Sequence, residues 1–414
     1  MSDAELLQTI VEFLAPRRIF RLGVAVSGGG DSTALLHLLA AWAGEHGAEI
    51  AAVTVDHGLR PGSAAEAAAV ARICAGLGVP HETLRWHWDG EGNLQDQARR
   101  ARLTLIADWA RGRGIGAVAL GHTRDDQAET FLMRLARGAG VDGLSGMSPE
   151  RHAEGIQWLR PLLTRSRAEL RDWLAGSGLA WFDDPSNENP DFDRVKARRA
   201  IGLLAPLGVE VEDLAAAAGR LSVARAALAE FAARTAAQIV RVEAGDVVFE
   251  REGFVSVPRE TQLRLLSHAL RWVASAEYGP RFAPLEESLE AVAEPARRVL
   301  HGCLISSNKR EVRVTREYQA VRDLSCKPGD TWDGRWMVRG EEAPGLDVRA
   351  LGETGLRDCQ NWREVGIPRT TLISTPSVWR EDKLIAAPLA GKPEGWVAEL
   401  TGGKEQFLAS LTAA

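Results

Sequence analysis

The sequence predicts an α/β protein that begins with a parallel sheet covered by helices on both faces. An apolar run at residues 22–26 meets three glycines at 28–30, and residues 34–39 then carry apolar side chains at helical spacing. That order indicates a strand, a tight loop and a helix. Further strands and helices are predicted in alternation: 50–55, 63–76, 82–86, 93–109 and 117–120. Such alternation is typical of a parallel sheet that binds ligands at the carboxyl ends of its strands.

Local signals add further elements to this first part. Residues 156–159 form a short apolar run that predicts a fifth strand, and residues 193–199 begin another helix. A serine followed three residues later by a glutamate is the pattern of a helix capping box. That pattern predicts three helix starts: Ser2 with Glu5, Ser63 with Glu66, and Ser166 with Glu169.

The composition changes near residue 208, which divides the chain into three predicted domains: 1–208, 209–318 and 319–414. The second domain is predicted to be mainly helical. It comprises a long alanine-rich helix at 211–240, helices at 259–275 and 284–293, and a hairpin at 299–315. The third domain is predicted to be small and mostly β, with short strands at 332–338, 371–374 and 383–387.

The composition restricts the classes of protein that the chain could represent. It has 414 residues and a net charge of -6, so no overall basic field indicates nucleic acid, although a local basic patch could still bind it. The cysteines (Cys74, Cys303, Cys326 and Cys359) show no CxxC spacing, which argues against structural zinc and a disulfide framework. We expect a cytoplasmic protein, since no apolar run approaches the 18 residues of a membrane span and the amino end lacks the pattern of a signal peptide.

The glycine-rich loop has the features of an anion site. Gly28, Gly29 and Gly30 allow close approach to a ligand, and the helix that follows presents unpaired N–H groups at its positive end. Ser27 and Ser32 add hydroxyl donors. The loop lacks the Gly-Lys-Ser/Thr ending of a Walker A motif.

Asp31 stands at the mouth of this loop, where a Mg²⁺ bound to phosphates would be held by a carboxylate. We therefore expect a phosphate site with Asp31 as the ligand of its Mg²⁺ ion. The plainer alternative is an ordinary glycine-rich turn.

An acidic segment follows the predicted strand at 117–120. His122 comes one residue after Gly121, and Asp125, Asp126 and Glu129 follow within one turn of the next helix. Three carboxylates so close together repel one another, which suits a divalent cation or a cationic amine. The alternative is a solvated acidic helix start, which the helix dipole favours.

A basic helix start lies near the end of the first domain. Arg194, Lys196 and Arg198 lie within five residues of one another, followed at once by Arg199. This pattern favours contact with the phosphates of RNA. A solvated helix face is the alternative.

The glycine loop resembles the SGGxDS loop of the N-type ATP pyrophosphatase (PP-loop) superfamily, whose members adenylate a substrate oxygen and release pyrophosphate. Together with other motifs it resembles the bacterial tRNA(Ile)-lysidine synthases. These motifs are residues 27–32, 55–60, Gln97-Ala98-Arg99-x-x-Arg102, 121–144, 160–163 and 186–198. The resemblance is specific over residues 20–205 and looser in the carboxyl-terminal part.

The resemblance implies a fold, the adenine nucleotide α hydrolase-like fold, and a reaction. The family uses ATP to adenylate the C2 oxygen of the wobble cytidine in a tRNA(Ile) with a CAU anticodon, and the side-chain amine of L-lysine then displaces AMP. One departure is Val195, where the family has an asparagine. Other possibilities are a tRNA thiolase, an amide-forming synthetase of the same superfamily, or a tRNA-binding protein without catalysis.

The charge of the lysine amine indicates what the acidic segment would have to do in this reaction. With an ordinary pKa near 10.4, only about one lysine amine in a few thousand is neutral at pH 7. The site must therefore bind the ammonium ion and remove a proton from it. We expect neighbouring carboxylates to raise the pKa of Asp126 towards that of a usable base, and His122 to relay a proton or hold the cytidine.

Overall fold

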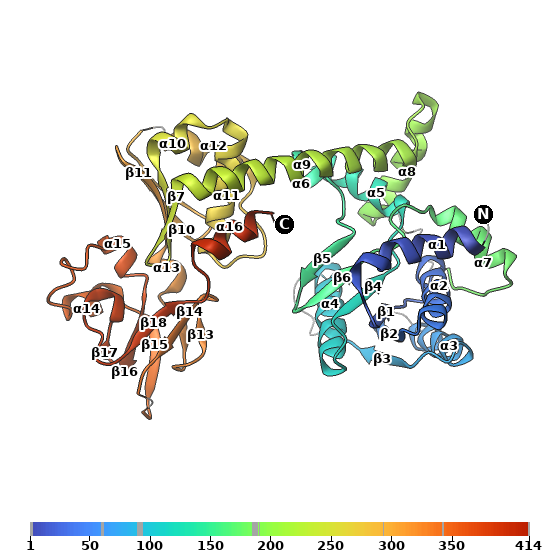
Figure 1. Cartoon of the computed structure of the whole chain (residues 1–414), viewed down its shortest axis with the longest axis horizontal. Helices are drawn as coiled ribbons and strands as arrows, with labels where there is room; N and C mark the ends of the chain where they lie inside the picture. Colours follow the sequence, from blue (N-terminus) through green and yellow to red (C-terminus); the bar gives the residue numbers. More distant parts are fainter. Residues whose placement is uncertain are drawn as a thin grey trace. The chain divides into compact units, whose positions relative to one another are not determined.

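The computed structural model describes residues 3–58, 62–88, 94–183, 189, 191–292, 294–341 and 343–412. The chain divides into two compact units, residues 1–225 and 226–414, and helix α9 (Val211–Ile239) contains the boundary between them (Figure 1). Each unit is described by itself. No helix among the described residues is long and apolar enough to cross a membrane.

Unit 1 contains a six-stranded sheet in the order β3-β2-β1-β4-β6-β5. Its elements before α9 are α1 (Asp3–Leu14), β1 (Arg21–Ala25), α2 (Gly30–His46), β2 (Glu49–Asp56), α3 (Ser63–Gly76), β3 (His81–Arg85), α4 (Leu94–Gly112), β4 (Ala117–Leu120), α5 (Arg124–Leu135), α6 (Val141–Leu144), β5 (Glu150–Ala153), β6 (Ile156–Leu159), α7 (Arg167–Gly176) and α8 (Asp193–Leu204). The predicted α/β class and the parallel sheet are confirmed. The exception is the edge strand β5, which the sequence reading missed and which pairs antiparallel with β6.

Alternate residues of the strands enter two separate cores, one on each face of the sheet. On β1, Leu22 and Val24 pack with side chains of α1, α2, α3 and α7. On β4, Val118 and Leu120 pack instead with α4, on the opposite face. Figure 1 shows α4 on one side of the sheet and α1 and α2 on the other. The central strands β2 and β4 are nearly continuous apolar runs because both of their faces are buried.

The strand order changes direction between β1 and β4. The chain runs from β1 to β2 and β3 on one side, and β4 then lies on the other side of β1. In open parallel sheets, ligands bind at the carboxyl ends of the strands where the order changes direction in this way. The glycine loop follows β1, and the acidic segment follows β4. Both predicted site segments therefore lie at this edge of the sheet.

Gly121 allows the two segments to approach each other. A Cβ atom at this position would lie 2.9 Å from both Cα and N of Ser32, and 3.1 Å from the carbonyl carbon of Asp31. These are backbone atoms in the first turn of α2, so they could not move aside without shifting the helix. Glycine at the end of β4 is therefore what lets α2 begin so close to it.

The three predicted capping boxes have different outcomes. The one at Ser166 is confirmed: Ser166 Oγ accepts from Glu169 N–H at 3.1 Å, and the Glu169 carboxylate accepts from Ser166 N–H at 2.6 Å. The one at Ser63 is wrong, because Gly62 is the N-cap and Ser63 is the first helical residue. The Ser63 hydroxyl bonds the Asp56 carboxylate instead. Ser2 lies outside the described residues.

Unit 2 contains a five-stranded sheet in the order β7-β8-β11-β10-β9, a four-stranded sheet β12-β15-β16-β17 and a three-stranded sheet β13-β14-β18. Its elements after α9 are β7 (Val240–Glu243), β8 (Asp246–Glu250), α10 (Arg251–Ser256), α11 (Arg259–Val273), α12 (Phe282–Ala291), β9 (Arg297–Leu300), β10 (Cys303–Ser307), β11 (Glu311–Arg316), α13 (Tyr318–Val321), β12 (Ser325–Cys326), β13 (Thr331–Trp332), β14 (Trp336–Arg339), β15 (Leu346–Ala350), α14 (Gly352–Arg357), α15 (Arg369–Leu372), β16 (Pro376–Arg380), β17 (Lys383–Ala386), β18 (Val397–Leu400) and α16 (Lys404–Thr412).

Two details of unit 2 differ from the sequence reading. The predicted hairpin at 299–315 belongs to a larger sheet, because β7 and β8 were not recognised after the long helix. The predicted strand at 371–374 is wrong: Pro368 caps the short helix α15 there. On that helix, the Thr371 hydroxyl donates to the buried Asp246 carboxylate at 2.6 Å, which also accepts from Arg313 at 3.0 Å. A helix at Thr371, which makes this buried hydrogen bond, thus replaces the strand that the β-branched side chain of threonine favours.

The close packing at Gly121 predicts that alanine lowers the stability of the protein more at Gly121 than at Gly116, the glycine at the other end of β4. We expect Gly121→Ala to lower the free energy of unfolding by about 1–3 kcal/mol, the usual cost of overpacking. Gly116→Ala is the matched control, because a Cβ atom there would meet no atom within 4 Å. Urea denaturation followed by circular dichroism measures both. Equal stability of the two variants would contradict the proposed role of Gly121.

Candidate active site

Hydrogen bonds of two serine hydroxyls fix the conformation of the glycine loop. Ser32 Oγ donates to the Gly29 carbonyl at 3.0 Å and accepts from Ser27 N–H at 3.2 Å, and the two serine hydroxyls lie 3.1 Å apart. Gly28 has a φ of +87°, a conformation that favours glycine. Gly29 is the N-cap of α2, and no side chain caps the helix there. The first N–H groups of α2 are thus available to an anion.

A segment after α7 covers one side of this loop. Phe182 N–H donates to the Gly28 carbonyl at 2.9 Å, and a Cβ atom at Gly28 would lie 3.3 Å from the Phe182 ring. A Cβ atom at Gly30 would lie 3.5 Å from the Trp181 ring. Of the residues that follow, 184–188 and 190 lie outside the described residues.

The predicted carboxylates converge on one arginine, Arg167, at the start of α7. Its guanidinium contacts Asp31 from α2 at 3.2 Å. It also contacts Glu129 at 3.2 Å and Asp126 at 3.6 Å, both from α5. Its backbone N–H donates to Asp125 at 2.8 Å. We call these four carboxylates, Asp31, Asp125, Asp126 and Glu129, the acidic cluster.

Two further arginines from α8 neutralise the buried part of the acidic cluster. Arg194 donates to Asp126 Oδ1 at 3.1 Å, and Arg198 donates to Glu129 Oε1 at 3.0 Å. Asp126 is additionally fixed through its other oxygen, which accepts from Thr123 N–H at 2.8 Å and Thr123 Oγ1 at 3.0 Å. The predicted basic helix start therefore reaches the acidic segment across about 70 residues of sequence.

The pKa values of two carboxyl groups in the acidic cluster shift in opposite directions. Burial raises the pKa of Asp31 to about 6, although the Arg167 guanidinium acts against it. Burial alone would also raise the pKa of Asp126, but Arg194 and Arg167 hold it below its ordinary value. Our expectation that neighbouring carboxylates raise the pKa of Asp126 is therefore wrong, because arginines surround it more closely than carboxylates do.

His122 is a half-buried, neutral imidazole beside Asp126. Burial lowers its pKa to about 3, and the positive charges of Arg160, Arg194 and Arg102 act in the same direction against Asp126. Its Nδ1 atom is buried without a hydrogen-bond partner. A neutral ring with an unsatisfied nitrogen can accept or donate one hydrogen bond to a bound molecule.

Two carboxylate oxygens of the acidic cluster are suited to a cation. Asp31 Oδ1 and Glu129 Oε2 are buried and lack hydrogen-bond partners. Carboxylate oxygens are the ligands that Mg²⁺ prefers, and an unpartnered buried oxygen is costly unless something binds it. Among the described residues, no group of three or more His, Cys, Asp or Glu side chains is already arranged around one metal position.

The structure brings together most of the predicted site residues but separates one of them. Lys196 points away from the acidic cluster: its ammonium lies 3.7 Å from Asp193 one turn earlier, and its side chain is 61% exposed. Arg167 was missed, since Ser166 and Glu169 were read only as a helix cap. A basic residue at the first position of a helix on the ligand edge of the sheet was the available signal.

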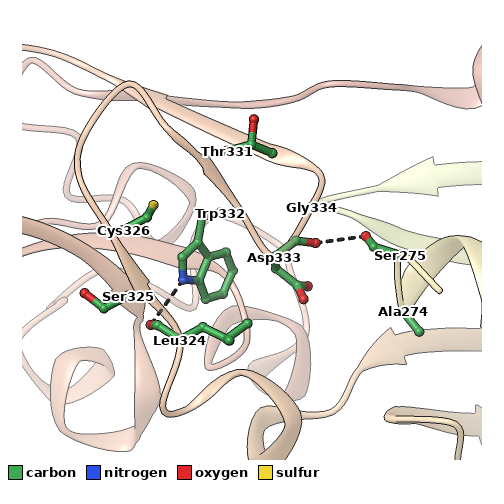
Figure 2. Close-up of a pocket in the computed structure, with 9 residues that line it drawn as sticks. All are labelled: Ala274, Ser275, Leu324, Ser325, Cys326, Thr331, Trp332, Asp333 and Gly334. Atoms are coloured by element: carbon green, nitrogen blue, oxygen red, sulfur yellow. Dashed lines mark hydrogen bonds between the residues drawn. The ribbon is translucent and has the colours of Figure 1, made fainter. Parts of the chain in front are cut away.

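A cavity in unit 2 is separate from this site. It has a volume of about 390 Å³ and is lined by Ala274, Ser275, Leu324, Ser325, Cys326, Thr331, Trp332, Asp333 and Gly334. Figure 2 shows that polar groups at its wall already bond one another: Trp332 donates to the Leu324 carbonyl at 3.3 Å, and Ser275 donates to the Asp333 carbonyl at 2.8 Å. No predicted site residue lines it.

Comparison with known proteins agrees with this geometry. Residues 3–204 match the family model of the PP-loop domain. A tRNA(Ile)-lysidine synthase of Ruegeria pomeroyi is 50% identical over 392 residues, which cover 94% of each chain. One of a Bradyrhizobium species is 37% identical over 71% of this chain and 89% of its own. One of Wolbachia pipientis is 31% identical over 89% of this chain and 88% of its own.

The charge state of His122 can be tested by titration. Because its pKa is lowered, the imidazole should stay neutral as the pH falls from 8 to 5. Nitrogen-15 NMR of protein labelled at histidine measures this, with the His122 signal identified by its loss in His122→Gln. A protonation midpoint near the ordinary histidine value of about 6.5 would contradict the neutral assignment.

Proposed function

The chain belongs to the tRNA(Ile)-lysidine synthase family, PP-loop enzymes that modify tRNA with the use of ATP, and we propose the full reaction that it catalyses. It joins the side-chain amine of L-lysine to C2 of the wobble cytidine in a tRNA(Ile) with a CAU anticodon. ATP first adenylates the C2 oxygen with release of pyrophosphate, and lysine then displaces AMP. A protein that modifies tRNA in this way is expected to work in the cytoplasm.

One observation carries this proposal: the acidic cluster lies against the glycine loop at the same edge of the sheet. Arg167 contacts Asp31 in the first turn after the loop and Glu129 on α5 simultaneously. A nucleotide on the loop and a cationic amine on α5 would thus be neighbours. The proposed reaction requires this, because the amine must reach the carbon whose oxygen ATP has just adenylated.

The loop is proposed to bind the phosphates of ATP through Ser27, Gly28, Gly29, Gly30 and Ser32. Its N–H groups and hydroxyls donate to phosphate oxygens, and the dipole of α2 favours their negative charge. Asp31 Oδ1, which is buried and unpartnered, fits a Mg²⁺ ion. When bound, that ion would neutralise charge on the phosphates and so favour departure of pyrophosphate.

The lysine amine is proposed to bind at Asp126 and Glu129. Both carboxylates are buried, and Asp126 is held ionised by Arg194, which suits the binding of an ammonium ion. A carboxylate with a lowered pKa is a weak proton acceptor, so we assign Asp126 to binding the amine, and test separately whether it also removes the proton. The neutral His122 beside it is proposed to hold the cytidine or relay a proton.

The basic start of α8 is proposed to reach the tRNA. Lys196 is exposed and faces away from the acidic cluster, whereas Arg194 and Arg198 are half-exposed and already bonded to carboxylates. Phosphate contact is therefore assigned first to Lys196. Arg194 and Arg198 could contact tRNA only with their remaining donors. The segment 209–318 is also proposed to contact tRNA.

Two other readings fit the site less well. A tRNA thiolase would need a reactive cysteine near the sheet, but Cys74, the one cysteine of unit 1, is fully buried, and burial raises the pKa of its thiol to about 11. A reactive cysteine has a lowered pKa and is partly exposed. A tRNA-binding protein without catalysis would not need the buried acidic cluster beside the glycine loop.

Asp31→Asn should slow pyrophosphate release about 100-fold or more, because the amide cannot neutralise a cation among the phosphates. Pyrophosphate is measured by an enzyme-coupled assay with ATP, Mg²⁺ and tRNA. The circular dichroism spectrum should remain that of the wild type. Unchanged turnover would remove Asp31 from the metal site.

The whole reaction is tested by incubating the protein with ATP, Mg²⁺, labelled L-lysine and total tRNA. Label should appear in one tRNA, and sequencing should identify it as tRNA(Ile) with a CAU anticodon, modified at the wobble cytidine. No label in tRNA, or label at another nucleotide, would contradict the proposal.

The role of Asp126 is tested by trapping the intermediate. The Asp126→Asn enzyme should still form adenylated tRNA from ATP and tRNA, yet consume it at least about 100-fold more slowly when lysine is added. Glu129→Gln serves as the parallel variant. If Asp126→Asn cannot form adenylated tRNA at all, the residue belongs to the ATP half of the reaction.

Removal of Lys196 should act on tRNA binding alone. Lys196→Ala is expected to weaken tRNA affinity and to reduce the salt dependence of binding by roughly one unit. Filter binding between low and moderate salt measures both quantities. Arg113→Ala, which removes an arginine paired with Glu82 near the amino ends of the strands, is the control. Unchanged affinity and salt slope would assign Lys196 to a solvated face.

A further inference from the structure

The guanidinium of Arg167 lies at the centre of the acidic cluster. Its guanidinium lies between the glycine loop and α5, the region where the proposed reaction needs the nucleotide and the lysine amine to meet. Its side chain is only 19% exposed, and it contacts three carboxylates from two helices. A positive charge of the protein thus occupies the place that a cationic substrate would need.

The contacts of Arg167 are unequal. At Asp126 and Glu129 it duplicates other guanidiniums, since Arg194 lies 3.1 Å from the first and Arg198 3.0 Å from the second. These two carboxylates would therefore remain paired if Arg167 left them. At Asp31, Arg167 is the one cation that lies within ion-pair distance among the described residues, and the other oxygen of Asp31 has no partner.

The backbone of Arg167 is held by contacts that do not involve its side chain. Its N–H donates to Asp125 at 2.8 Å, and the preceding Ser166 forms the confirmed capping box with Glu169. The side chain has several rotatable bonds and ends in a fork that matches phosphate as well as carboxylate. A rotation of the side chain could thus exchange one set of anions for the other without moving α7.

We propose that Arg167 is an exchangeable counter-ion, which holds the acidic cluster together without substrates and moves to the phosphates of bound ATP when the lysine ammonium takes its place at Asp126 and Glu129. This inference rests on the proposed function and adds a residue to it. Since one cation replaces another at Asp126 and Glu129, their charge stays compensated. Arg167 then stabilises the departing pyrophosphate.

The proposal predicts opposite effects on the two substrates. Without the guanidinium, lysine no longer has to displace a competing cation, and a ligand freed from such competition binds more tightly. In Arg167→Gln, the dissociation constant of L-lysine should fall about threefold to tenfold. Formation of adenylated tRNA, in contrast, should slow about 10- to 100-fold, because a donor to the phosphates is lost.

The experiment measures binding of labelled L-lysine by equilibrium dialysis, with and without total tRNA. It also measures pyrophosphate release with tRNA and saturating L-lysine, because Arg167 is proposed to move to the phosphates when lysine binds. Arg167→Lys separates charge from geometry: it keeps a competing cation, so lysine binding should remain near the wild type, but it lacks the fork, so pyrophosphate release should slow. Arg113→Gln is the control, with both quantities unchanged. Circular dichroism and thermal unfolding show whether each variant is folded.

The outcomes separate this inference from the proposed function. If folded Arg167→Gln binds lysine as weakly as the wild type or more weakly, the exchange is wrong and Arg167 is a structural counter-ion. If its pyrophosphate release is unchanged, Arg167 does not contact phosphates and the exchange is equally wrong. If wild-type protein transfers no lysine to tRNA, the proposed function itself fails.

Discussion

Four carboxylates can lie together at the edge of this sheet only because guanidinium groups lie among them. Buried anions that face one another repel strongly, and a buried charge without a partner is among the costliest features of a folded protein. Arg167 joins Asp31 on α2 to Glu129 on α5, and Arg194 and Arg198 join α8 to α5. Charge compensation thus holds four helices together at the carboxyl ends of β1 and β4.

The sheet explains why the acidic cluster lies there. The central strands β2 and β4 bury side chains on both faces, so their polar neighbours lie beyond the strand ends. The reversal of strand order beside β1 leaves the ends of β1 and β4 adjacent, and Gly121 permits their loops to approach within van der Waals distance. The nucleotide loop and the acidic cluster are therefore neighbours for a topological reason as much as an electrostatic one.

Much of this could be predicted from the sequence, because its signals are local. The strand, loop and helix around Gly28–Gly30, the strand at Ile156–Leu159 and the capping box at Ser166 are confirmed, and each depends on neighbours within a few residues. Arg167 was missed because its partner Asp31 lies 136 residues away. The pKa of Asp126 was misjudged for the same reason: the nearby carboxylates were visible in the sequence, whereas the pairing with Arg194 was not. At Thr371, a buried contact with Asp246 overrode a β-branched pattern.

If the acidic cluster receives the lysine amine beside the nucleotide, a crystal structure of the wild-type protein with a non-hydrolysable ATP analogue, Mg²⁺ and L-lysine should show it. We expect the lysine side-chain nitrogen within hydrogen-bonding distance of Asp126 or Glu129, the analogue on the glycine loop, and Arg167 turned towards its phosphates. Lysine bound elsewhere, with Arg167 still bridging Asp31 and Glu129, would rule out this arrangement of the substrates.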